Sequence, residues 1–77
     1  MTIISQDGNL IIQMKNYDIV RFECSINAIT LDGKREVSLA TYSSKAKAEI
    51  EWKRLQNELI HGDHSFYRFR KDEEVMG

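Results

Sequence analysis

One segment of the chain, from Ser43 to Gly62, has the pattern of an amphipathic helix. Four apolar residues recur in it at spacings of four, three and four, which places them on one helical face: Ala48, Trp52, Leu55 and Leu59. Ser43 or Ser44 can accept a hydrogen bond from a free amide of the first turn, and Gly62 can adopt the left-handed conformation that ends a last turn. The pattern predicts a helix with both ends marked and one face to bury.

The rest of this helix carries charges of opposite sign four residues apart, among them Lys47 with Glu51. Such pairs stabilise an exposed helix by a few tenths of a kcal/mol each, so they predict a solvated outer face. One apolar residue, Ile50, also falls on that face. It is interpreted either as an ordinary exposed side chain or as a contact for a partner.

Two short apolar runs at the start of the chain predict a hairpin. Thr2 to Ser5 and Leu10 to Met14 are rich in isoleucine, and Asp7-Gly8 lies between them. An Asp-Gly pair favours a tight turn because both residues accept a positive φ angle. The two runs are expected to pair as antiparallel strands.

The clearest strand pattern runs from Tyr17 to Ser25, where apolar and polar residues alternate. Since neighbours on a strand point to opposite faces, the alternation predicts a buried face. That face would carry Val20, Phe22, Cys24 and Ile26, with Arg21, Glu23 and Ser25 on the other. The period changes afterwards, which predicts a turn or a bulge between Ser25 and Asn27.

A second Asp-Gly pair, Asp32-Gly33, predicts another turn, after which the alternation resumes from Val37 to Thr41. A two-residue loop would place Ala28 opposite Val37. A three-residue loop would place Ile29 there instead, and the sequence leaves both registers open.

Together these segments predict one α+β domain over residues 1–77. We expect an antiparallel β-meander of about five strands packed against one long C-terminal helix, followed by a short final strand or an extended tail. The acidic end after Lys71 is expected to extend into solvent. The predicted core consists of Val20, Phe22, Val37, Leu39, Ala48, Trp52, Leu55 and Leu59.

Charge and composition narrow the classes of function. Eleven basic residues against twelve acidic ones give a net charge of −1, so no long-range field attracts nucleic acid or an anionic membrane. No run approaches the roughly 20 apolar residues that span a bilayer, and the start of the chain lacks the pattern of a signal peptide. The single cysteine, Cys24, fits a reducing compartment and a small buried side chain. A cytoplasmic location is therefore predicted.

One cluster contains possible metal ligands, His61-Gly62-Asp63-His64. Two imidazoles and a carboxylate suit zinc, but the spacing lacks the helical His-Glu-x-x-His arrangement. We interpret His61 as a partner for the negative end of the helix dipole and expect neither metal nor cofactor. The chain also lacks a Gly-x-Ser-x-Gly elbow and a glycine-rich phosphate loop, so no enzyme is predicted.

Basic and aromatic residues alternate from Tyr67 to Lys71, as in proteins that bind single-stranded nucleic acid. Lys34 and Arg35 could extend such a patch. The acidic run of residues 72–74 directly downstream would repel the same phosphates. Nucleic-acid binding is therefore the alternative. The leading interpretation of this segment is that Phe66 or Tyr67 and Phe69 pack inward while Arg68 and Arg70 pair with nearby carboxylates.

Three segments resemble a group of small uncharacterised proteins from prophages and mobile elements of Firmicutes. These are Ile3 to Gly8, the stretch from Leu39 to Ser44 with Lys47-Ala48 after it, and Phe69 to Val75. The resemblance covers most of the chain and implies a phage or mobile-element origin without any known activity. The expected strands and helix are also similar in outline to small pleckstrin-homology-like domains, which is a likeness of fold alone.

No residue set in the chain specifies a reaction or a ligand. The leading hypothesis is a non-catalytic protein–protein interaction module, or one that self-assembles, since a small core and open sheet edges gain from a partner. The candidate partner contacts are Ile50, Tyr67, Arg68 and Arg70.

Overall fold

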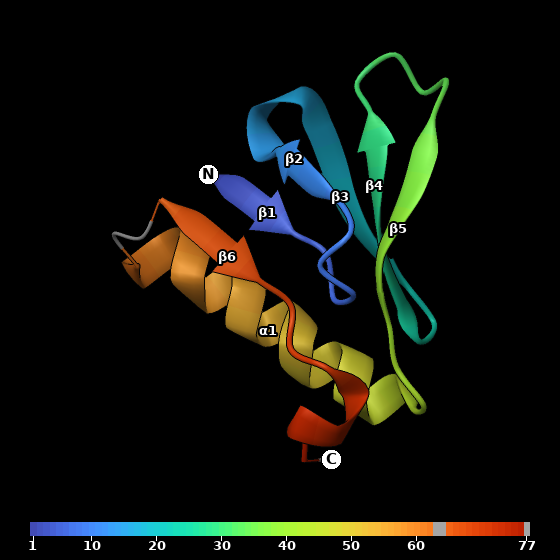
Figure 1. The fold of residues 1–77 in the computed structure, drawn as a ribbon, viewed down its shortest axis with the longest axis vertical. Helices are drawn as coiled ribbons and strands as arrows, with labels where there is room; N and C mark the ends of the chain where they lie inside the picture. Colours follow the sequence, from blue (N-terminus) through green and yellow to red (C-terminus); the bar gives the residue numbers. More distant parts are fainter. Residues whose placement is uncertain (63–64, 77) are drawn as a thin grey trace.

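The computed structural model describes residues 1–62 and 65–76, and it has the predicted α+β fold. Within these residues, six strands form two three-stranded sheets, and one long helix packs against them (Figure 1). The elements are β1 (Thr2–Ile4), β2 (Ile11–Gln13), β3 (Tyr17–Phe22), β4 (Ser25–Thr30), β5 (Glu36–Thr41), α1 (Lys45–His61) and β6 (Phe66–Arg68), with 3-10 turns at Met14–Asn16 and Asp72–Glu74.

The first sheet has the strand order β2-β1-β6. Its hairpin is antiparallel, as predicted, and its register places Ile3 opposite Ile12. β6 pairs with β1 in the parallel sense, because α1 carries the chain back along the sheet before β6 enters it. The five expected strands and the short final strand are therefore all present, but they divide between two sheets instead of forming one meander, and α1 precedes the last strand (Figure 1).

The second sheet has the order β3-β4-β5, and its first turn comes earlier than predicted. Glu23, with a φ of 55°, and Cys24 form the turn, so Phe22 lies opposite Ser25. Because the chain reverses there, Phe22 and Ile26 fall on opposite faces of the sheet. Ile26 is buried and Phe22 is 70% exposed, which corrects the assignment of Phe22 to the core. Cys24 is only partly buried.

The pairing of β4 with β5 follows the first of the two open registers, with Ala28 opposite Val37. The register shifts after Ile26, which lies opposite Ala40. A bulge of this kind lets two successive residues face the same way. Leu39 and Ala40 are accordingly both buried.

The two Asp-Gly turns, in loops 5–10 and 30–35, have the same construction. In each, the aspartate Oδ1 accepts hydrogen bonds from the hydroxyl two residues earlier, at 2.6 Å, and from the main-chain N–H two residues later, at 2.9 Å. The glycines have φ angles of 77° and 74°, which confirms the predicted positive φ. Hydrogen bonds from the hydroxyl and the main chain hold the pKa of Asp7 and of Asp32 below its usual value.

The helix begins as predicted but ends differently. The side chain of Ser44 accepts a hydrogen bond from the main-chain N–H of Lys47, at 3.2 Å. Gly62 has a φ of −83° rather than a left-handed conformation. A Cβ atom there would lie 2.7 Å from the carbonyl oxygen of Glu58, so the position requires glycine for close approach and not for its φ angle.

The core is one cluster shared by the helix, both sheets and the C-terminal segment. Of the predicted core residues, Leu39, Ala48 and Leu55 are buried, Val20, Val37 and Trp52 are partly buried, and Phe22 and Leu59 are exposed. The remaining buried apolar residues are Ile3, Ile12, Ile26, Ala28, Ala40, Tyr42, Tyr67, Phe69 and Val75. The buried face of α1 is centred on Ala48, Glu51 and Leu55, so it is rotated away from Leu59.

The C-terminal segment packs against the helix instead of extending into solvent as predicted. Phe69 and Val75 are each 1% exposed. Asp72 accepts a hydrogen bond from the main-chain N–H of Ser43, at 2.7 Å, and forms an ion pair with Lys47, at 3.3 Å. The segment therefore joins the start of α1 to the core (Figure 1).

The rotated helix face leads to a prediction with two matched leucines. Replacing the buried Leu55 by alanine is expected to lower the free energy of unfolding by about 2 to 5 kcal/mol, because it leaves a cavity. The same change at Leu59, which is 43% exposed, is expected to cost less than about 1 kcal/mol. Urea denaturation measures both values, and equal losses would contradict the observed orientation of α1.

Candidate functional site

A buried carboxylate, Glu51, lies where α1 meets the C-terminal segment. Its side chain has no exposed surface. Glu51 follows Ala48 by three residues and precedes Leu55 by four, so all three share one helical face. The predicted surface pair of Glu51 with Lys47 is therefore wrong, because Lys47 forms its ion pair with Asp72.

Two arginines satisfy this carboxylate. Arg70 donates its main-chain N–H to Glu51 Oε1 at 2.9 Å and its Nε–H to Oε2 at 2.9 Å, and Arg70 Nη2 lies 2.8 Å from Oε2. Arg54 donates from Nη1 to Oε1 at 2.9 Å. Both arginine side chains remain more than a third exposed, so each contacts Glu51 on one side and solvent on the other.

Tyrosines extend this arrangement. Arg54 Nη1 also donates to the hydroxyl of Tyr67 at 3.0 Å, and its guanidinium carbon lies 4.8 Å from the centre of that ring. Tyr42 donates its hydroxyl to the carbonyl oxygen of Arg70 at 2.7 Å. The strand β6, the segment after it and α1 are thus held together by side chains from four parts of the chain.

The electrostatics of Glu51 favour its ionised form. Burial acts to raise the pKa of this carboxyl, but hydrogen bonds from Arg70 and the charges of Arg54 and Arg70 outweigh it and hold the pKa below 4.5. Burial raises the pKa of the Tyr42 and Tyr67 hydroxyls, and the nearby Glu51 charge adds to the effect. At neutral pH the site therefore contains one carboxylate, two guanidinium groups and two neutral hydroxyls.

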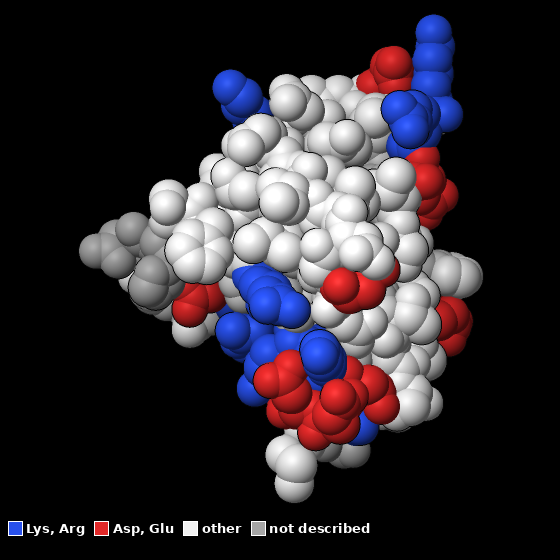
Figure 2. Space-filling model, viewed as in Figure 1, with Lys and Arg blue, Asp and Glu red and all other residues white. Residues whose placement is uncertain are grey.

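Above this buried site the surface is hollowed. Two adjoining hollows of about 590 Å³ and about 240 Å³ both have Arg54 and Arg68 in their walls, and we call them together the β6 groove. The other lining residues are Glu58, Phe66, Tyr67, Phe69, Arg70, Lys71, Glu73 and Glu74. Figure 2 shows basic and acidic side chains next to each other in the region where Figure 1 places β6 and the C-terminal segment.

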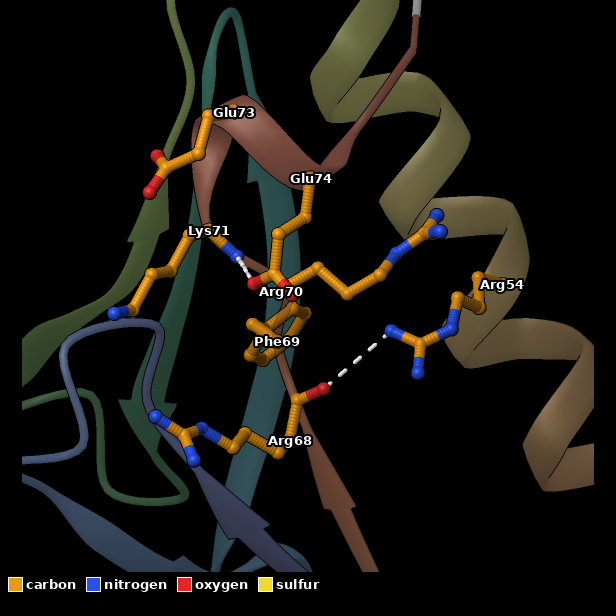
Figure 3. A pocket seen from close by; sticks show the side chains of 7 residues that line it. All are labelled: Arg54, Arg68, Phe69, Arg70, Lys71, Glu73 and Glu74. Atoms are coloured by element: carbon orange, nitrogen blue, oxygen red, sulfur yellow. Dashed lines mark hydrogen bonds between the residues drawn. The ribbon is translucent and has the colours of Figure 1, made fainter.

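The groove carries charges of both signs. Figure 3 shows Arg68 at one end and Glu73 at the other, with Arg70, Lys71 and Glu74 between them. Glu74 accepts a hydrogen bond from the main-chain N–H of Lys71 at 2.8 Å, and the carbonyl oxygen of Arg68 accepts one from Arg54 at 3.4 Å. Neither the Arg68 side chain nor that of Glu73 forms a hydrogen bond or an ion pair with the residues that the structure describes.

The predicted contact residues are only partly brought together. Arg68 and Arg70 line the groove, while Tyr67 is buried and contacts only the smaller hollow. Ile50, 36% exposed, lies outside it. The sequence interpretation missed Glu51 and Arg54, although the position of Glu51 between Ala48 and Leu55 is a signal that the periodicity carries.

Comparisons with protein-family models, with curated proteins and with solved structures found no match to this chain. The resemblance to prophage proteins and the pleckstrin-homology-like outline therefore stay predictions. Function has to be inferred from the geometry of the chain itself.

The candidate metal cluster beginning at His61 lies partly outside the described residues, since residues 63 and 64 are not among them. Within the part of the chain that is described, no group of three His, Cys, Asp or Glu side chains could hold a metal ion. No helix in that part is both long and apolar enough to cross a bilayer.

Proposed function

We propose that this chain is a non-catalytic protein-interaction module, of phage or mobile-element origin and located in the cytoplasm, which binds its partner at the β6 groove. One observation carries the proposal. Arg68 and Glu73 present opposite charges in one groove, and neither is used by the described residues around it. Charges of both signs on a shaped surface give an interface its specificity.

The state of Glu51 supports a non-catalytic role. A general acid or base acts best with a pKa near the working pH, whereas two arginines hold the pKa of Glu51 below its ordinary value. Its oxygens are already occupied by Arg54, Arg70 and the hydroxyl of Tyr67. Glu51 is accordingly interpreted as the support of the groove rather than as a reacting group.

The mixed charges favour a protein over nucleic acid as the partner. Every nucleotide carries a phosphate, so a single strand in the groove would bring negative charge close to Glu73 and Glu74. A polypeptide can place charges of either sign where they fit. The exposed Phe66, at 59%, adds an aromatic contact of the kind that protein interfaces use.

Capture from a lysate of the source organism tests the groove. The Arg68→Glu variant is expected to lose a captured protein that the wild type and the Arg35→Glu variant retain. Arg35 is also an exposed arginine, and it lies at the far hairpin, so it controls for net charge. An Ile50→Glu variant tests the other candidate contact. If the captured protein is lost with Ile50→Glu but retained with Arg68→Glu, the interface lies around Ile50 on α1 and the proposal is contradicted.

Self-association is a second proposal, supported by the edge strands of the two small sheets, which are β2 and β6 in one and β3 and β5 in the other. Sedimentation velocity at several protein concentrations should then show a sedimentation coefficient that rises with concentration. A coefficient that stays at the monomer value throughout would rule it out.

A further inference from the structure

We propose that the β6 groove recognises an extended peptide segment of mixed charge, with a carboxylate bound at Arg68 and a basic side chain next to Glu73. This inference rests on the proposed function and names the chemistry of the partner. It follows from two observations. The arginines of the groove have hydrogen-bond donors that the described residues do not use, and charges of both signs lie along the groove.

The arginines of the groove keep donors for a ligand. All three hydrogen bonds that Arg54 makes with described residues leave from Nη1, so its Nη2 and Nε groups keep their donors. Arg70 contacts Glu51 through Nε and Nη2, which leaves Nη1. The Arg68 guanidinium uses none of its donors on the described residues. Guanidinium groups pair with carboxylates in two-donor geometry, which makes a carboxylate the fitting anion.

Two of these arginines are already held in place. Glu51 fixes the guanidinium groups of Arg54 and Arg70 before any ligand arrives, so binding costs less side-chain entropy than it would with free arginines. The negative charge of Glu51 also offsets the repulsion between these two cations. The groove therefore offers a preorganised basic wall.

The sign of the charge changes along the groove. From one end to the other the groove presents Arg68, then Arg70, Lys71 and Glu74 close together, then Glu73 (Figure 3). The Glu74 carboxylate is held by the main-chain N–H of Lys71, so the acidic end of the groove consists of Glu73 and Glu74. A segment that is uniformly acidic would meet repulsion at Glu73. A segment with a central carboxylate and a basic residue beside it meets an opposite charge at both places. The same order disfavours a polyphosphate strand, whose charge does not change sign along its length.

Selection from a display library of random peptides tests this inference even though the partner is unidentified. An extended chain advances about 3.3 Å per residue, so peptides about ten residues long can reach across even the longest extent of the molecule, 33 Å. The immobilised wild-type protein serves as the target. A counter-selection step against the Arg68→Glu variant removes the peptides that bind outside the β6 groove. We expect the enriched peptides to share a central Asp or Glu with Lys or Arg beside it.

A synthetic peptide of the enriched sequence is then measured by fluorescence anisotropy. Arg68→Glu and Lys71→Glu are each expected to weaken its binding about tenfold or more, and Arg35→Glu to leave it unchanged. Circular dichroism of each variant confirms that the exposed substitutions leave the fold intact. The peptide with all charges reversed should bind at least about tenfold more weakly.

Three results would overturn the inference: no enrichment over the Arg68→Glu counter-selection, a consensus that lacks either the acidic or the basic position, or tighter binding of an oligodeoxythymidine strand than of the peptide. If lysate capture still depends on Arg68 in any of these cases, the interaction surface stands and only the proposed charge pattern of the bound segment fails. If capture is also independent of Arg68, both proposals fail.

Discussion

Replacing Glu51 by glutamine is expected to lower the free energy of unfolding by about 3 kcal/mol, because two guanidinium groups lose their buried counter-charge. Glutamine keeps the shape of the side chain, but its amide N–H group would face the N–H donors of Arg70. For a domain of this size the loss corresponds to a fall in melting temperature of about 12 to 24 °C. Thermal unfolding followed by circular dichroism gives this value.

The matched control is Glu49→Gln, the same substitution on the same helix. Glu49 is 45% exposed and its ion pair with Arg21 is long, at 3.9 Å. A pair of this kind contributes little, so the control should unfold within a few degrees of the wild type. Similar melting temperatures for the two variants would mean that the buried ion pairs do not support the fold.

The same carboxylate makes stability depend on pH in a definite direction. Because the pKa of Glu51 is lower in the folded chain than its ordinary value of 4.5, the stabilisation is fully present above pH 4.5. It is lost as the pH falls through the folded-state pKa and the group becomes protonated. Asp7, Asp32 and Asp72 also have lowered pKa values, so Glu51→Gln should reduce the loss of stability in acid without abolishing it.

Replacing Phe69 by alanine is expected to cost about 3 to 5 kcal/mol, because the ring is fully buried and fills a space that the surrounding elements share. The ring packs edge-on against Tyr67, with 5.1 Å between the ring centres. Its loss would loosen the floor of the β6 groove as well as the core. Urea denaturation measures the change.

Phe66→Ala provides the comparison for this prediction, since Phe66 lies three residues earlier and is 59% exposed. Its removal should change the free energy of unfolding by no more than about 0.5 kcal/mol. If Phe69→Ala were as mild as Phe66→Ala, the C-terminal segment would not be part of the folded core.

Only some residues of the candidate site could be predicted from the sequence. The alternation from Tyr67 to Lys71 indicated Arg68 and Arg70 as exposed basic residues. It could not indicate that Arg70 binds Glu51, because the two positions are 19 residues apart in the chain. Opposite charges four residues apart suggested Lys47 as the partner of Glu51, but tertiary contacts override such weak local pairs.

The sequence by itself determined the two Asp-Gly turns, the first hairpin and the extent of α1. These features depend on φ angles and on hydrogen bonds between residues only a few positions apart, so local residue types are sufficient. Only the tertiary structure decided the parallel pairing of β6, the turn at Glu23 and the burial of Glu51. Each of these features depends on contacts between segments that are far apart in the sequence. Which apolar and charged side chains become buried is set only when the whole chain packs.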